Sequence, residues 1–250
     1  MKILSNVILL AVILLPIQIS NCLAQGAVTL FNGVSFTYYQ IDLESTKLVL
    51  LSKDDNGVRL RNAGELELRA KRSGKSLKFA TNSGIFDSRF NSLGLHVEAG
   101  KQITSLNTGE GDGNFYLKPN GVFYVKGSQA SVVPTEKFDN GLTVDYATQS
   151  GPLLLDQGII NSKFNPNSVN KLIRSGVGVK LGSIVIFAIS DDPVTFYEFA
   201  TFFRDHLKCR SALYLDGVIS KMYAADLNRL QKSGDFAAMF VVFGDGNVGE

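Results

Sequence analysis

Three stretches in the second half of the chain decide the fold and point to a site: TQSGPLLL (Thr148–Leu155), IRSGVGV (Ile173–Val179) and LYLDGVIS (Leu213–Ser220). Each places small or polar residues at the end of an apolar, strand-like run, where a rigid scaffold can hold them at a pocket rim. Two of these residues are charged, Arg174 and Asp216, and both lie near glycines that allow a ligand to approach the backbone. An isolated cation and a carboxylate in this setting suit an anionic substrate that is attacked or protonated, so the sequence predicts an enzyme.

Around these stretches, apolar and polar residues alternate with the period of β-strands. Leu213–Leu215 and Met239–Phe243 are expected to be buried strands. The alternation, together with the turn residues between its runs, predicts three antiparallel strand pairs: Val34–Leu43 with Lys47–Leu51, Phe115–Lys118 with Val122–Val125, and Val177–Val179 with Ser183–Ile189.

Helices are expected at two places. Asp192 and Pro193 have the types of a cap and a first helical residue. Apolar residues then recur at three- and four-residue steps, namely Phe196, Phe199, Ala200, Phe203 and Leu207. Ala63–Lys75 combines helix-favouring residues with a strand-like alternation, and we interpret it as a helix. The sequence therefore predicts an α+β fold: a single domain with a large mixed, mostly antiparallel sheet packed by a few helices.

The first 24 residues have the pattern of a secretory signal peptide. A lysine precedes an apolar run over Ile3–Ile19, and Cys22–Ala24 supplies the stretch before the expected cleavage point. A membrane anchor is the competing interpretation, but the uninterrupted core Val7–Leu15 is too short to span a bilayer as a helix. We expect a Sec-type signal peptide over residues 1–24, a periplasmic or secreted location, and no stable membrane insertion after its removal.

Residues 25–250 show no linker, internal repeat or long charge block, so we expect a single domain with a real hydrophobic core. Cys209 would then be the single cysteine, expected to be buried and inert. Lipidation of Cys22 is the alternative to cleavage after Ala24, although Asn21 is a poor residue to precede a lipid-modified cysteine.

Composition argues against several classes of function. The formal net charge is +2 for the whole chain, and no concentrated basic face is evident, so nucleic acid is not expected as a partner. The two histidines, His96 and His206, lack partners at zinc-ligand spacing, and no metal or cofactor is predicted. The glycine-rich loop Gly109–Asn114 lies between strands and opens no helix, which fits neither a nucleotide fingerprint nor a helix-loop-helix calcium site.

Eight blocks of sequence occur in an order that is more specific than any one of them: Phe79–Phe86, Gly94–Glu98, Gly113–Phe115, Pro119–Phe123, Ala147–Pro152, Ile173–Val179, Phe202–Asp205 and Leu215–Gly217. Together they resemble the phosphodiester glycosidase family, in its small secreted bacterial branch, over about residues 30 to 243. The resemblance implies hydrolysis of a sugar-1-phosphodiester at the glycosidic carbon, and therefore a phosphorylated glycan or sugar-1-phosphodiester as the partner.

The resemblance also suggests roles for residues. Asp216 would stabilise the positive anomeric carbon, attack it or activate water, and Arg174 would grip the phosphate oxygens through its planar fork. Six further residues would bind substrate through hydroxyl, amide or backbone groups: Asn82, Gln149, Gly176, Gly178, Gly217 and Ser220. Glu98 is a candidate second carboxylate, for which a solvated surface role is the alternative.

Two other interpretations of the sequence stay open, and a departure from the family pattern motivates the first of them. Family members often continue with glycines after the aspartate, whereas this chain has Val218 and Ile219 there, which puts the backbone contacts of that loop in doubt. A glycan-binding module without turnover is therefore the alternative from a different class. A glycosidase for neutral sugars is the third, and it would depend little on Arg174.

Overall fold

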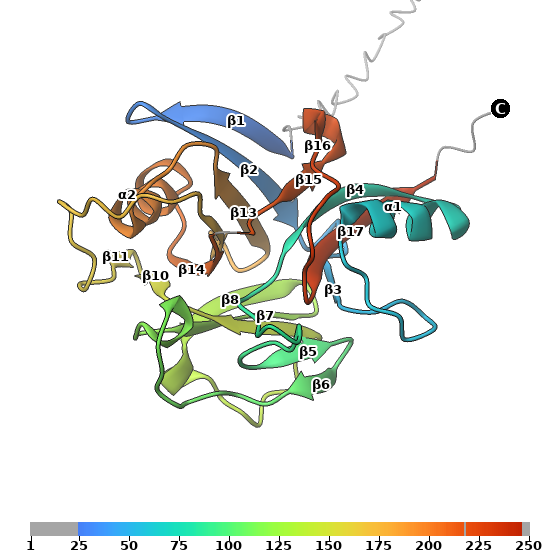
Figure 1. Ribbon diagram of the computed structural model, residues 1–250, viewed down its shortest axis with the longest axis horizontal. Coiled ribbons are helices and arrows are strands. Elements are labelled where there is room, and N and C mark those ends of the chain that lie inside the picture. Colours follow the sequence, from blue (N-terminus) through green and yellow to red (C-terminus); the bar gives the residue numbers. More distant parts are fainter. Residues whose placement is uncertain (1–24, 218, 247–250) are drawn as a thin grey trace, which may run out of the picture.

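The computed structural model describes residues 25–217 and 219–246. The expected signal peptide (residues 1–24), Cys22 and Val218 lie outside the described residues. The fold is α+β, with three sheets of seven, five and five strands and few helices (Figure 1). Every strand pair within these sheets is antiparallel. The predicted α+β class and its mostly antiparallel character are confirmed, and the strands divide among three sheets.

Strand order in each sheet mixes distant parts of the chain. The seven-stranded sheet runs, from edge to edge, through β1 (Gly26–Phe31), β2 (Val34–Asp42), β13 (Ile184–Ser190), β12 (Ser175–Val179), β14 (Ser211–Asp216), β10 (Leu153–Asp156) and β11 (Ile159–Ile160). The second sheet runs through β16 (Arg229–Leu230), β15 (Met222–Ala224), β4 (Lys75–Asn82), β17 (Met239–Asp245) and β3 (Val49–Leu51). The third sheet runs through β6 (Lys101–Thr104), β5 (His96–Glu98), β9 (Tyr146–Ser150), β7 (Gly121–Lys126) and β8 (Gln129–Pro134).

Two α-helices and several short helical turns complete the fold. Helix α1 begins after Asn62, whose side chain accepts a hydrogen bond from the Glu65 amide, and it lies along β4 (Figure 1). The helical elements are α1 (Ala63–Arg72), α2 (Phe196–Thr201), the π-helical turn η3 (Phe202–His206), and the 3-10 turns η1 (Asn114–Tyr116), η2 (Thr135–Lys137) and η4 (Ala225–Leu227). No helix of the described residues is long and apolar enough to cross a membrane.

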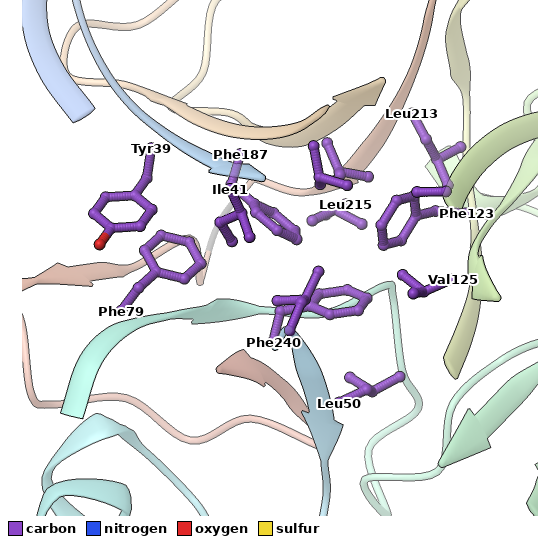
Figure 2. Close-up of a cluster of buried hydrophobic side chains, with 14 of the residues drawn as sticks. Tyr39, Ile41, Leu50, Phe79, Phe123, Val125, Phe187, Leu213, Leu215 and Phe240 are labelled. Carbon is purple, nitrogen blue, oxygen red and sulfur yellow. The ribbon is translucent and has the colours of Figure 1, made fainter. Parts of the chain in front are cut away.

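The main core lies where the three sheets face one another. Figure 2 shows Phe187 of the seven-stranded sheet, Phe240 of the second sheet and Phe123 of the third sheet meeting there. The Phe240 ring lies 5.3 Å from the Phe123 ring and 5.1 Å from the Phe187 ring, centroid to centroid. Because aromatic pairs at this spacing stabilise a fold beyond the burial of their apolar area, this contact holds the three sheets against one another.

The central strands of the seven-stranded sheet, from β13 through β12 to β14, are buried on both faces, and this positions the candidate site. Leu213 and Leu215 of β14 enter the main core, whereas Tyr214 joins a second cluster under α2 and η3. The register of β14 against β12 shifts between Tyr214 and Asp216, because Gly176 pairs with Tyr214 whereas Ser175 pairs with Asp216. Asp216 therefore ends β14 directly after a bulge.

Two of the predicted strand pairs are wrong. β2 pairs with β1 and β13, and β3 pairs with β17 in another sheet, so the short turn between β2 and β3 joins two sheets. Phe115–Lys118 is not a strand: residues 114–116 form the turn η1, and β7 pairs with β8 and β9 instead. The buried side chain of Asn120 donates to the Phe115 carbonyl, which closes this segment on itself and removes an acceptor that a ladder would need.

The second helix also begins later than predicted. Its cap is Thr195, which forms a capping box with Glu198, and not Asp192. Asp192 instead accepts a hydrogen bond from the Ser35 amide, and Val194 pairs with Leu172 in an extended bridge. The predicted helix over residues 63–75 is confirmed for Ala63–Arg72, and the predicted pairing of β12 with β13 is confirmed.

The buried thiol of Cys209 gives a first testable prediction. Burial raises the pKa of Cys209 to about 12, opposed weakly by the charge of Lys180. Because the thiolate is the reactive form, we expect iodoacetamide to leave Cys209 unmodified in the folded protein at pH 8.5. After the protein is unfolded in guanidinium, the peptide that contains Cys209 should be alkylated, and mass spectrometry measures this. Fast alkylation in the native state would contradict this burial.

Candidate active site

The antiparallel pairing of β12 and β14 brings the two charged residues of the site together. Ser175 pairs with Asp216 at the end of this ladder, so Arg174, one residue before Ser175, lies beside the end of β14. Asp216 is half-buried, and its Oδ1 accepts a hydrogen bond from the Gly217 amide at 2.5 Å. The carboxylate is thereby held at the rim of the sheet.

Arg174 is buried to an unusual degree for its type, with 1% of its surface exposed. Its Nε donates to the Val194 carbonyl at 2.8 Å and its Nη2 to the Asn170 carbonyl at 3.2 Å. Its guanidinium carbon lies 3.7 Å from the centre of the Phe196 ring, within cation–π range. Nη1 is also buried. Desolvation lowers the pKa of this guanidinium, whereas the Tyr214 hydroxyl is close enough to raise it.

Tyr214 connects the arginine to the aspartate. Burial is the main cause that raises the pKa of the Tyr214 hydroxyl, and the carboxylate of Asp216 raises it further. The Arg174 guanidinium and the Asn114 side chain act in the opposite direction on this pKa. A neutral phenol therefore stands between a cation and a carboxylate, where it can donate a hydrogen bond to one group while accepting from the other.

A network of buried hydroxyl and amide groups holds the main chain of this aspartate from the other face. Ser175 and Ser220 both donate to the Asp216 carbonyl, at 3.0 Å and 2.8 Å. Asn82, at the end of β4, donates to the Ser175 hydroxyl at 3.0 Å. This arrangement ties the second sheet to the end of β14, and because each partner is satisfied the aspartate is held rigidly.

A hollow of about 390 Å³ opens beside this network. It is lined by Ile173, Ile189, Ser190, Asp191, Gly217, Ser220, Lys221, Arg229 and Gln231. Arg229 is positioned there by two bonds of its Nη1, both 2.6 Å long, to Asp191 and Thr37. The Nε of Arg229 is buried without a hydrogen-bond partner in the described part of the chain. The wall therefore carries two cations, Lys221 and Arg229, against one carboxylate, Asp191, which is paired with Arg229, and this excess of positive charge suits an anion.

Gly217 lies between the hollow and the Tyr214 hydroxyl. A side chain at this position would collide with the Tyr214 hydroxyl, and its Cβ would lie 3.0 Å from the Ile173 carbonyl. Only a residue without Cβ leaves this space, so the glycine brings the hollow next to the Tyr214 and Asp216 groups.

Other predicted binding residues lie elsewhere or are already engaged. Gly176 and Gly178 are in the middle of β12, where a Cβ would meet Phe203, so the structure places an aromatic side chain against them. The Gln149 side chain accepts from the amides of Leu95 and Asn107 and donates to the Asn107 carbonyl and the Thr135 hydroxyl. Of the predicted binding residues, Gly217 and Ser220 line the hollow, and Asn82 braces it from behind.

Sequence reasoning missed three residues of this site, namely Tyr214, Lys221 and Arg229. Tyr214 was hidden in the apolar run of β14, and the two cations lie in segments without a periodic pattern. Among the described residues, no group of three or more histidine, cysteine, aspartate or glutamate side chains is arranged to hold a metal ion.

Solved structures share this fold, and one of them is a catalytic domain. The catalytic domain of zebrafish N-acetylglucosamine-1-phosphodiester alpha-N-acetylglucosaminidase, auto-inhibited by its pro-peptide, superposes with a TM-score of 0.59 at 16% identity, over 87% of this chain and 81% of that chain. A putative exported protein of Burkholderia pseudomallei K96243 superposes with a TM-score of 0.55 at 9% identity, over 84% of this chain and 74% of that one. At these identities the likeness shows the fold.

The sequence itself defines the family. The phosphodiester glycosidase family model matches residues 75–243, and the chain belongs to this family. The uncharacterized protein YigE of Escherichia coli (strain K12) is 40% identical over 147 residues, which are 59% of this chain and 58% of that protein. The match thus spans a little over half the length of that curated relative. The resemblance deduced from the sequence blocks is confirmed at the level of the family.

Proposed function

We propose that the protein is a hydrolase that cleaves the glycosidic bond of a sugar-1-phosphodiester. The observation that supports this most is the cluster of Arg174, Tyr214 and Asp216 beside a hollow lined by Lys221 and Arg229. A carboxylate next to cationic donors matches a substrate that develops positive charge on its sugar and carries negative charge on its phosphate. Membership in the phosphodiester glycosidase family supports the same assignment.

In the proposed reaction, the bond between the anomeric carbon and the phosphate oxygen breaks and water adds across it, giving a free sugar and a phosphomonoester. The Asp216 carboxylate acts at the anomeric carbon, as a nucleophile or by activating the water. The departing phosphomonoester has a second pKa of about 6, so it leaves with little need for protonation. Neutralising its charge therefore matters more than supplying a proton.

The cations provide that neutralisation. In this proposal the phosphate lies in the hollow, with Lys221 and Arg229 in its wall and the buried Arg174 guanidinium beyond Gly217. Ser220 and the main chain at Gly217 complete the contacts, and Asn82 keeps Ser175 and hence Asp216 in register. Packing against Phe203 at Gly176 and Gly178 supports this site, as do the hydrogen bonds by which Gln149 anchors a loop.

We also propose that the protein acts on a glycan outside the cytoplasm, because residues 1–24 have the composition of an export signal. A panel of purified sugar-1-phosphodiesters tests the reaction: release of free sugar with a phosphomonoester as the second product is expected. Binding of these compounds without release would instead identify a glycan-binding module, the alternative that Val218 and Ile219 motivate.

Lys221 gives a prediction that tests the phosphate position. Lys221→Met should raise KM for a sugar-1-phosphodiester by about tenfold or more, since a hydrogen bond to a charged group contributes about 1.5–3 kcal/mol. Steady-state kinetics of sugar release measure it. The exposed Lys126 at the end of β7 provides the matched control, because Lys126→Met removes the same charge away from the hollow.

A second substrate makes this test specific. The 4-nitrophenyl glycoside of the same sugar has no phosphate, so whatever slow hydrolysis it undergoes should be equal in the wild-type protein and in Lys221→Met. Equal losses on both substrates would show that Lys221 supports the fold of the site and does not bind phosphate.

A further inference from the structure

A second set of chemically complementary side chains lies outside the hollow described above. His96, on β5, is buried with 2% of its surface exposed. Its Nδ1 lies 2.7 Å from the Ser92 Oγ, and its Nε2 lies 2.7 Å from Oε1 of Glu98. Serine, imidazole and carboxylate are thus connected in a row by two short hydrogen bonds, as in an activated nucleophile.

The partners fix which nitrogen carries the proton. An ionised carboxylate can only accept a hydrogen bond, so Nε2–H donates to Glu98. The neutral imidazole then has its lone pair on Nδ1, which accepts the hydrogen bond from the Ser92 hydroxyl. This is the tautomer that a general base needs in order to take the serine proton, although the two ring nitrogens have the reverse roles from those in the chymotrypsin triad.

The serine and the histidine open onto a separate hollow of about 110 Å³. Ser92 itself is only half-buried, so its hydroxyl is within reach of a small molecule. Phe90, Ile103 and Ala237 give this hollow an apolar part of its wall. Its size admits an acyl group of only a few heavy atoms. None of its residues lines the hollow beside Asp216.

Positive charge is built into the same wall. Lys53 and Arg59 line the hollow, and Arg59 is fixed by bonds of its Nη1 to Asp235 at 2.6 Å and to the Phe236 carbonyl at 2.9 Å. The Arg59 guanidinium lies 3.6 Å from the centre of the Phe90 ring. A cation held in place in this way is suited to stabilise an oxyanion that forms on an attacked carbonyl.

We propose that Ser92, His96 and Glu98 form a second catalytic site, which hydrolyses esters of short carboxylic acids. The Ser92 Oγ attacks the ester carbonyl carbon while its proton passes to His96 Nδ1. The C–O bond to the alcohol then breaks, and the alcohol leaves with the proton from Nδ1. Water attacks the acyl-serine, gives one proton to Nδ1, and the carboxylic acid departs as Ser92 regains its proton. Glu98 is a positioning residue that acts through the imidazole.

Methanesulfonyl fluoride and 4-nitrophenyl acetate test the proposal on the whole protein. Methanesulfonyl fluoride should attach its sulfonyl group to Ser92, with loss of fluoride, and tandem mass spectrometry should place the adduct on the peptide that contains this residue. 4-Nitrophenyl acetate should be hydrolysed much faster than 4-nitrophenyl octanoate, because the hollow is small. The sulfonylated protein should lose the acetate activity.

The variants separate catalysis from structure. Ser92→Ala and His96→Gln should each lower the acetate hydrolysis by about a hundredfold or more, and Glu98→Gln by about tenfold. The exposed Ser105, whose hydroxyl accepts only from Gln102, is the control: Ser105→Ala should hydrolyse the acetate like the wild type. Labelling of the wild-type chain needs no variant to fold. An unlabelled Ser92 in the native protein, or an unchanged rate in folded Ser92→Ala, would overturn the proposal and leave His96 as a brace for its loop.

Discussion

Replacing Asp216 by asparagine is expected to lower the release of sugar from a sugar-1-phosphodiester by about a thousandfold or more. The amide keeps the shape of the side chain but can neither attack the anomeric carbon nor take a proton from water. The Gly217 amide can still donate to the side-chain oxygen at position 216, so the rim of the sheet should keep its form. Initial rates of sugar release under substrate excess, compared at equal protein concentration, measure the effect.

The control for this change is the exposed Asp226 in η4. Asp226→Asn removes the same charge from the surface and should leave the rate of sugar release unchanged. Binding distinguishes the alternatives, because Asp216→Asn should still bind the phosphodiester in calorimetry through the cations of the hollow. If the wild-type protein and Asp216→Asn both bind the compound and neither releases sugar, the protein is a glycan-binding module.

The proximity of Arg174 and Asp216 was predictable because both residues follow from the same local pattern. Each lies at one end of a short apolar run, and two such runs become neighbours once β12 and β14 pair in opposite directions. The glycines next to them were expected to let a ligand approach the backbone. The sequence does not say what approaches: at Gly217 it is a tyrosine hydroxyl beside a hollow, but at Gly178 it is the ring of Phe203.

What the sequence could not predict depends on contacts between distant segments. Strands of the seven-stranded sheet are buried on both faces, so alternation in LYL does not reveal that Tyr214 faces Arg174. Runs that are neighbours in the sequence were predicted to pair, yet β3 pairs with β17, which lies near the other end of the chain. In the same way, the hydrogen bond between His96 and Ser92 forms only because the loop that carries Ser92 folds back over β5.

Hydrogen bonds between separate sheets make the candidate site rigid. Ser175 of the seven-stranded sheet and Ser220 of the loop after β14 both donate to the Asp216 carbonyl, and Asn82 of the second sheet donates to the Ser175 hydroxyl. A shift of any one sheet would break hydrogen bonds in a buried setting, where an unsatisfied polar group costs about 1–3 kcal/mol. The hydrophobic core shown in Figure 2 also packs these sheets against each other.

Arg174→Met is expected to remove most of the phosphodiester hydrolysis, by about a hundredfold or more, while the protein stays folded. Methionine is similar in length and can keep contact with the Phe196 ring, over which the guanidinium now lies. The change removes the donor to the Asn170 carbonyl and one of the two donors to the Val194 carbonyl, which keeps the Leu172 amide. It also ends the burial of a cation, whose pKa is lowered by desolvation. Because these two effects oppose each other, the melting temperature should move by only a few degrees.

The separation of activity from stability decides what this buried arginine does. If its purpose were only to brace the loop before α2, Arg174→Met would lower the melting temperature and leave sugar release from the folded fraction near the wild-type rate. If Nη1 serves the phosphate, Arg174→Lys, which keeps the charge but not the fork, should recover only part of the rate that Arg174→Met loses. Arg69→Met on α1 controls for the loss of one positive charge. Calorimetry and initial rates on the same preparations, with the phosphate-free glycoside as the second substrate, therefore assign Arg174 either to the leaving group or to the fold.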